Sequence, residues 1–150
     1  MIKTALVTLK GIRYSGDSIG DDIKVEVETP NNLISIEKKI RKRTAVEFNK
    51  EIVQITTDRD SLVLPVVIRI IEKDLIFNDV GSAKENIKIN FTAKKPYQVT
   101  YEIDVHESQV VTTQRTAKFH VDFEIMVVPG IIRYVGKIDG GWLLGKRDDN

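Results

Sequence analysis

The amino-acid sequence predicts an all-β protein, an antiparallel eight-stranded β-sandwich. β-Branched residues are unusually frequent, because 48 of the 150 residues are Ile, Val or Thr, whereas only 13 are the helix-favouring Ala or Leu. Several segments alternate apolar and polar residues with a period of two, as half-buried strands do. Turn residues separate these segments at intervals typical of two packed sheets. The composition excludes an α-helical bundle.

Eight strands are predicted in chain order, at 2–10, 23–29, 33–40, 44–55, 62–71, 87–92, 98–105 and 116–128. Loops are predicted at 11–22, which is rich in Gly, Ser and Asp, and at 72–85. The 62–71 segment is the most apolar and is expected to be the central buried strand. Pro65 within it lacks an N–H donor, so it should lie at an edge or a bulge.

The length suits one domain, with the sandwich over residues 1–128 and a C-terminal extension over 129–150. Pro129-Gly130 breaks the last core strand, and Asp139-Gly140-Gly141 is a tight-turn signal, so 131–144 is predicted to form a short hairpin. Residues 1–10 lack the long apolar region of a signal peptide. We therefore expect a soluble, cytoplasmic protein, with peripheral membrane association as an open alternative.

Composition and motifs also limit the function. The 23 basic and 22 acidic residues nearly cancel, which argues against whole-surface attraction to nucleic acid. The lack of Cys excludes disulfides, thiolate metal sites and thiol nucleophiles. The sequence contains no Gly-rich phosphate loop, nucleophile elbow or HExxH pair. His120 lies on the polar face of an alternating segment and is expected to face solvent. We therefore expect a protein without catalytic activity.

Two predicted loops are acidic. The first contains Asp17, Asp21 and Asp22, and the second contains Glu72, Asp74 and Asp79. Calcium takes six to eight oxygen ligands, which carboxylates at one end of a sandwich would supply. Alternatively, these acids simply occupy solvated turns, where Asp is common. Spacing alone leaves both interpretations open.

Three segments resemble a C2 domain. The run LVTLKGIRYSGDSIGDDIKVEV at 6–27 resembles the opening of that family, with a strand, a KGL-like bend, an Asp-bearing loop and a second strand. Residues 43–54 resemble its K-T-x-V strand, and VVIRIIEKDLIFNDVGSA at 66–83 resembles its V-x-V-x-D-x-D segment. Together the three cover most of residues 1–92 in the family's order.

The resemblance implies a C2-like sandwich with calcium as its cofactor. It places Asp17 and either Asp21 or Asp22 as ligands in the first calcium loop, and Glu72, Asp74 and Asp79 as ligands in the third. Glu72 stands where the family usually has Asp. The proline and tyrosine of the family's D-P-Y motif are absent from this chain, and Asp79 is a single acid where a pair is common.

Two further features would suit a surface that docks on membranes. Leu75, Ile76 and Phe77, here called the apolar tip, lie between the acids of the second loop. They would either insert between lipid headgroups or fold back over the core. Residues 37–43, here called the basic segment, carry a local charge of +4 on Lys38, Lys39, Arg41, Lys42 and Arg43. Such a segment would attract an anionic leaflet or form a solvated edge that discourages aggregation. It has no interleaved aromatic residues, so no nucleic-acid partner is expected.

The leading hypothesis is a non-catalytic C2-like recognition module that associates with membrane surfaces or protein partners, with calcium dependence left open. The main alternative is an assembly subunit that forms homo-oligomers without calcium. It would use a sandwich edge, Val110-Val111 and the 131–144 hairpin with Trp142. A carbohydrate-binding sandwich is less favoured, because the chain has one Trp and four Tyr to offer as coplanar exposed aromatics.

Overall fold

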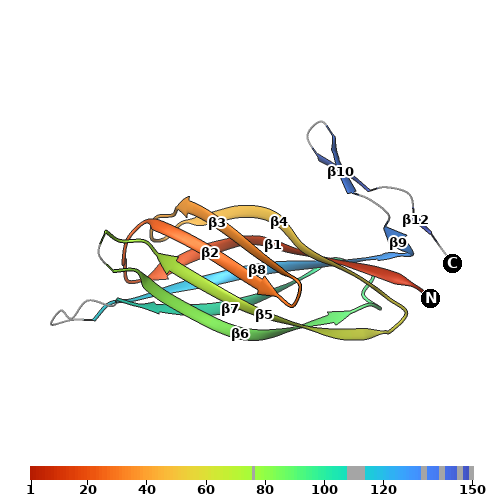
Figure 1. Cartoon of the computed structure of the whole chain (residues 1–150), viewed down its shortest axis with the longest axis horizontal. Coiled ribbons are helices and arrows are strands. Elements are labelled where there is room, and N and C mark those ends of the chain that lie inside the picture. The colour runs from red at the N-terminus through yellow and green to blue at the C-terminus, as the bar shows by residue number, and fades with distance from the viewer. Residues whose placement is uncertain (76, 108–113, 133–134, 139–140, 145–146, 149–150) are drawn as a thin grey trace.

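The protein is an all-β sandwich of two antiparallel four-stranded sheets, as predicted (Figure 1). A computed structural model describes residues 1–75, 77–107, 114–132, 135–138, 141–144 and 147–148, with side chains as far as Ile131. The first sheet has the order β4 (Ala45–Thr57), β1 (Lys3–Gly16), β8 (Thr116–Pro129), β7 (Tyr97–His106). The second has the order β3 (Asn32–Lys39), β2 (Asp22–Thr29), β5 (Ser61–Glu72), β6 (Asp79–Asn90).

Alternate side chains of each strand fill one core between the sheets. The inward positions of β8 show the rule clearly, because Ala117, Phe119, Val121, Phe123 and Ile125 are all fully buried. The residues between them point outward and are polar. This period of two is the pattern that predicted the strands from sequence.

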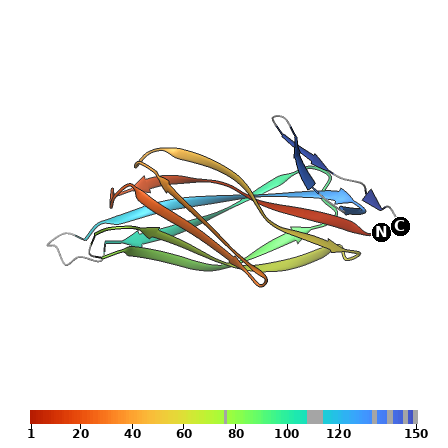
Figure 2. The ribbon, with the colours of Figure 1, turned by 45° about the horizontal axis from the view of Figure 1, so that its top comes forward.

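Successive connections lie alternately at the two ends of the sandwich. Those at 17–21, 40–44 and 73–78 lie at the end drawn on the left in Figure 1, here called the loop end, where β7 also ends and β8 begins. The connections at 30–31, 58–60 and 91–96 lie at the other end, here called the turn end, where the chain also begins (Figure 2). The topology thus gathers both predicted acidic loops and the basic segment at the loop end.

Two strand boundaries differ from the predictions. β1 continues to Gly16, although the strand was predicted to end at residue 10. A register shift between Leu9 and Gly11 interrupts the alternation of buried and exposed residues, which restarts at Ile12. This interruption is the reason that the prediction stopped too early. β6 begins at Asp79, so the predicted 72–85 loop is limited to residues 73–78. The start of β6 has small or polar residues on its inward face, Gly81 among them, and therefore lacks the apolar alternation of a strand.

The prediction for β5 is correct in part. β5 lies inside its sheet, between β2 and β6. Its burial is one-sided, since Val66 and Ile68 are buried whereas Val63 on the outer face is 57% exposed. Pro65 lies opposite Asn86 of β6, beyond the last residue of β5 that pairs with β2. At Pro65, β5 therefore has no paired neighbour on its β2 side. The N–H group that proline lacks would have made no hydrogen bond to β2 there.

Side chains of β7 close the free edge of β6. The Tyr97 hydroxyl accepts a hydrogen bond from Asn90 N at 2.8 Å and donates one to Lys88 O at 3.2 Å. The Tyr101 hydroxyl donates to Asn86 O at 3.4 Å. Three backbone groups that would otherwise be open to another strand are thereby occupied, which protects this edge from further pairing.

The C-terminal extension contains the predicted hairpin, formed by β10 (Val135–Ile138) and β11 (Gly141–Leu144) in antiparallel pairing. β9 (Ile131–Ile132) pairs with β12 (Arg147–Asp148). Residues 139–140 of the predicted turn, the Trp142 side chain and Val110-Val111 lie outside the described part of the chain.

Candidate functional site at the loop end

Backbone hydrogen bonds join the acidic and basic loops into one surface. Ile40 N of the basic segment donates to Asp21 O at 2.8 Å, and Lys73 N donates to Asp22 O at 2.8 Å. Asp21 in the 17–21 loop therefore contacts the 40–44 loop, and Asp22 at the start of β2 contacts the 73–78 loop. Groups that lie far apart in the sequence are brought together here because their strands end on the same side.

Glu72 is the buried centre of this surface. It follows Ile68 and Ile70 in the inward series of β5, so its side chain enters the end of the core and is only 5% exposed. Its Oε2 atom is buried and has no hydrogen-bond partner. Burial raises the pKa of Glu72 to about 7, and nearby carboxylates add to the rise: Asp74, Asp79, Asp22 and Asp21.

The structure brings five of the six predicted acids together, and we call these five the acid cluster. Asp79 is 5% exposed and pairs with Glu72 across β5 and β6. Asp21, Asp22 and Asp74 are exposed around them. Asp17 lies elsewhere, because its carboxylate accepts a hydrogen bond from Thr116 N at 3.0 Å. Its role is to hold the 17–21 loop against the start of β8.

The acid cluster has the chemistry of a hard-cation site. Its donors are carboxylate oxygens, which calcium prefers, and the Glu72 Oε2 atom has no other partner. In the described residues, no three acidic or histidine side chains stand close enough to share a metal ion. The described side chains therefore do not form a ready-made metal site.

Leu75 and Phe77 of the apolar tip point into solvent. Leu75 is fully exposed and Phe77 is 59% exposed, while Ile76 lies outside the described residues. The loop holds its own shape, since Asp74 Oδ1 accepts from Leu75 N at 2.7 Å and Asn78 Oδ1 accepts from Asp74 N at 3.1 Å. The alternative that the tip folds back over the core is wrong for Leu75 and Phe77.

The basic segment lies beside the acid cluster. Lys38, Lys39, Arg41 and Arg43 are exposed, and Lys42 is half-buried. A groove of about 450 Å³ lies at this end and is lined by Asp22, Ile23, Glu37, Lys38, Lys39 and Lys73. Lys73 Nζ lies 2.6 Å from Glu37 Oε1, and this hydrogen-bonded cation lowers the pKa of Glu37.

Sequence reasoning missed two residues that shape this end, Tyr14 and Gly20. Tyr14 is 1% exposed, and its hydroxyl lies between Ile19 N at 2.9 Å and Gly20 O at 3.0 Å. Both positions fell in a segment predicted to be a loop. The alternation of Ile12 and Tyr14 beyond Gly11 was the signal that could have extended the strand and identified Tyr14 as buried.

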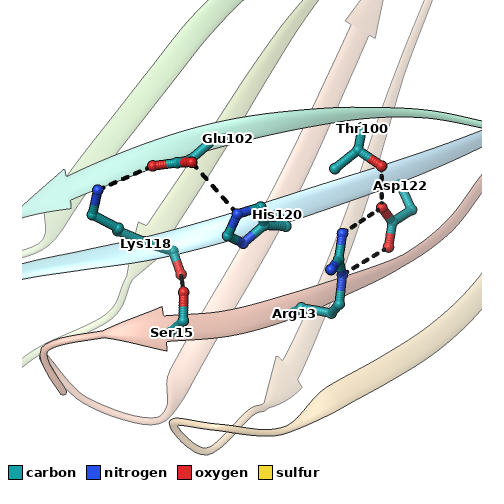
Figure 3. A network of polar contacts seen from close by, with 7 residues as sticks. All are labelled: Arg13, Ser15, Thr100, Glu102, Lys118, His120 and Asp122. Atoms are coloured by element: carbon teal, nitrogen blue, oxygen red, sulfur yellow. Dashed lines mark hydrogen bonds and ion pairs between the residues drawn. The ribbon is translucent and has the colours of Figure 1, made fainter.

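Polar side chains form a separate network on the outer face of the first sheet (Figure 3). Arg13 pairs with Asp122 at 3.0 Å, and Glu102 pairs with Lys118 at 3.1 Å and with His120 at 3.5 Å. The prediction that His120 faces outward is confirmed, since it lies half-exposed on this face. The network joins β1, β7 and β8 across the sheet and is distinct from the acid cluster.

No family model and no curated protein matches this chain. In the part of the chain that the structure describes, no helix is long and apolar enough to cross a membrane.

Proposed function

We propose that this chain is a non-catalytic C2-like recognition module that docks by its loop end on an anionic membrane surface, with calcium at the acid cluster. One observation carries the proposal: the exposed apolar tip lies on the same surface as the acid cluster and the basic segment. Apolar, anionic and cationic groups at one end match the layers of a lipid surface, which has acyl chains beneath charged headgroups.

The apolar tip supplies the first part of the binding energy. Leu75 and Phe77 remain in water in the free protein. Moving such a side chain from water into an apolar layer is worth about 1.5–3 kcal/mol. Two side chains on one short loop would therefore hold the module weakly and reversibly, and other contacts must add to them.

The basic segment supplies the second part. Each Lys or Arg close to an anionic leaflet contributes about 1 kcal/mol. Four exposed cations lie along this segment, and Lys38 and Lys39 line the groove beside the acid cluster. Headgroup phosphates are anions of a size that such a groove would admit.

Calcium would add positive charge where the module is most acidic. Without a cation, the carboxylates around Glu72 repel anionic lipid and one another. When bound, the ion would neutralise the cluster and attract lipid phosphate. Glu72, Asp79 and the exposed Asp21, Asp22 and Asp74 are the residues that would hold it.

Vesicle co-sedimentation tests the docking surface. We expect the full chain to sediment with vesicles of phosphatidylcholine and phosphatidylserine when millimolar calcium is present, and less with phosphatidylcholine alone or with EDTA. Leu75→Ser combined with Phe77→Ser should abolish sedimentation. The matched control is Leu33→Ser combined with Val63→Ser, which alters two side chains that are 51% and 57% exposed elsewhere on the sandwich. This control should bind like the wild type.

Thermal unfolding with excess EDTA or with about 1–5 mM calcium tests the cation separately. We expect calcium to raise the midpoint, and this rise to disappear in Asp74→Asn and Asp79→Asn. A wild-type protein that stays in the supernatant with every vesicle would overturn membrane docking. A dimer that is indifferent to calcium and lipid would instead support the assembly alternative.

A further inference from the structure

The two sides of the sandwich differ in how their strand edges are covered. On one side, β6 and β7 lie against each other. Gly81 of β6 has no side chain, and a Cβ built there would collide with Asp104 O of β7, so the two backbones are in direct contact. Further along, the Tyr97 and Tyr101 hydroxyls bond to the β6 backbone. This side is therefore protected from pairing with a further strand.

The other side presents β4 and β3, and among the described residues no hydrogen bond joins these two strands (Figure 1). The edge of β4 is irregular, since two register shifts interrupt its pairing with β1 and Asn49 has a φ of 51°. Glu47, Lys50 and Glu51 are exposed along it. Bulges and charges of this kind protect an edge strand from pairing with another chain.

β3, in contrast, has a regular edge. Its pairing with β2 runs over Asn32–Lys39 without a register shift. Ile40 N continues this ladder by donating to Asp21 O, so every second residue back from Ile40 bonds toward β2. The residues between them direct their N–H and C=O groups away from the sheet, where no hydrogen bond from the described residues reaches them. These residues, here called the β3 edge, are Leu33, Ser35 and Glu37.

The β3 edge is complementary to itself. Two copies laid antiparallel, with Ser35 facing Ser35, bring the free backbone groups of one strand opposite those of the other. On the inner face, this register places the buried Ile34 opposite the half-buried Ile36 of the second copy, a favourable pair of β-branched residues. A register displaced by two residues would instead place Lys38 or Asn32 opposite an isoleucine. The inner face therefore selects the register centred on Ser35.

Charge favours the same antiparallel arrangement. Lys38 and Lys39 lie in the loop-end half of β3, whereas residues 32–36 carry no charge. Two parallel copies would place these cations opposite one another, which destabilises a strand pair. In the antiparallel register, Lys38 lies opposite Asn32 of the second copy, and Lys39 lies opposite Asn31. The charged half of each strand therefore meets the uncharged half of the other.

We propose that the β3 edge is a self-association surface, on which β3 of a second copy adds antiparallel to form a two-fold dimer. The second sheets of the two copies then form one continuous sheet, and each copy contributes the same patch. The two-fold axis directs the two loop ends in opposite directions, so each apolar tip remains accessible. A single strand pair is smaller than the stable interfaces of about 1,200–2,000 Å², so the dimer should be weak and reversible.

Sedimentation velocity of the full chain tests the dimer, at concentrations from about 10 μM to about 1 mM. We expect the sedimentation coefficient of the wild type to rise with concentration toward that of a dimer. Ser35→Pro removes an N–H that has no acceptor within the chain, so the fold keeps its bonds while the dimer loses its centre. This variant should remain monomeric. A wild type that is monomeric at the highest concentration, or a Ser35→Pro variant that dimerises, would overturn the inference and leave the β3 edge to a strand of another protein.

Ser61→Pro is the matched control. Ser61 is the first residue of β5 and pairs with Asn90, whose own N–H donates to the Tyr97 hydroxyl. The N–H of Ser61 therefore also faces away from β6, and proline is tolerated at the start of a strand. Ser61→Pro should dimerise like the wild type. Loss of the dimer in this control would show that the pairing does not lie at β3.

Amide hydrogen exchange of the wild type needs no variant, so it covers the case in which Ser35→Pro fails to fold. The Ser35 amide should exchange rapidly in dilute protein. Where nine-tenths of the chain is dimeric, its exchange should slow about tenfold, because only the monomer exchanges. The Ile34 amide, which bonds toward β2 in both states, is the reference. A Ser35 exchange rate that does not change with concentration would contradict the inference.

The inference does not rest on the proposed function, and vesicle sedimentation separates the two. Ser35→Pro keeps the apolar tip and the basic segment, so it should sediment with anionic vesicles as the wild type does. A wild type that dimerises but stays in the supernatant would overturn membrane docking and support the β3 dimer. A wild type that sediments with vesicles but is monomeric at every concentration would do the reverse.

Discussion

The two ends of the sandwich satisfy their polar groups in different ways. At the turn end, polar groups pair within and between the short turns: Asn90 Oδ1 accepts from Thr92 N at 2.9 Å, and Phe91 N donates to Asp60 O at 2.9 Å. Phe91 itself is 1% exposed and fills that end of the core. At the loop end, the corresponding position in the core holds Glu72, a carboxylate with a buried atom that has no partner.

The difference supports the proposal that the loop end is the docking surface. A buried polar atom without a hydrogen-bond partner destabilises a fold by about 1–3 kcal/mol. Apolar side chains exposed to water are also unfavourable, and a cluster of them usually marks an interface. The loop end combines both features, whereas the turn end buries its large aromatic residue. Unfavourable features concentrated at one end are those that a bound ion and a docked surface would relieve. The comparison suggests four tests, from the largest expected effect to the smallest.

Gly20→Ala should produce the largest change, because the new Cβ collides with the Glu72 carboxylate and the backbone has an unfavourable φ. We expect the free energy of unfolding to fall by about 2–4 kcal/mol, measured by urea denaturation. Ser18→Ala, in the same loop and exposed, is the control and should stay within about 0.5 kcal/mol of the wild type. Equal stability of Gly20→Ala and wild type would show that this contact is not tight.

Glu72→Gln should stabilise the protein at pH 8 by about 1–2 kcal/mol, because it removes a buried charge. Since the pKa rises from 4.5 to about 7 on folding, the folded state binds its proton more tightly. Wild-type stability should therefore decrease as pH rises from about 4.5 through 7, and this decrease should be absent in the variant. Denaturation at a series of pH values measures both effects.

Asp60→Asn, at the turn end, is the control for this pH series and should reproduce the wild-type profile. A variant Glu72→Gln that retains the wild-type slope would mean that another group titrates in this window. The same variant should also lose the calcium-dependent rise in unfolding midpoint.

Tyr97→Phe tests the turn end. The hydroxyl bonds to Asn90 N and Lys88 O would be lost, with an expected decrease in unfolding free energy of about 1 kcal/mol. Calcium affinity and vesicle binding should remain unchanged, because the residue lies far along the sandwich from the acid cluster. A change in either would show that the two ends are coupled.

Glu37→Gln should have the smallest effect on stability, because its pair with Lys73 is exposed to solvent. The unfolding midpoint should be the same as that of the wild type within the error of a thermal scan. Binding to anionic vesicles should strengthen slightly, since Lys73 is released toward the groove. Weaker vesicle binding would indicate that the pair itself forms part of the docking surface.

Local patterns in the sequence identified the sandwich and most of its strands. The β8 segment alternates from Thr116 to Ile125, and its predicted extent matches the structure at its start and within one residue at its end. Prediction failed where the pattern was interrupted. The register shift near Gly11 concealed the second half of β1, and the small residues at the start of β6 concealed that strand.

The sequence by itself determined the all-β class, the acidic loops, the basic segment and the apolar tip, because residue type and alternation are local properties. The tertiary structure decided which of these features meet. Only the packed sheets turn Glu72 into the core, separate Asp17 from the other acids and expose Leu75. The contact of Tyr14 and Gly20 with the acidic loop and Glu72 also depends on the fold, because burial and close approach arise from residues distant in the chain.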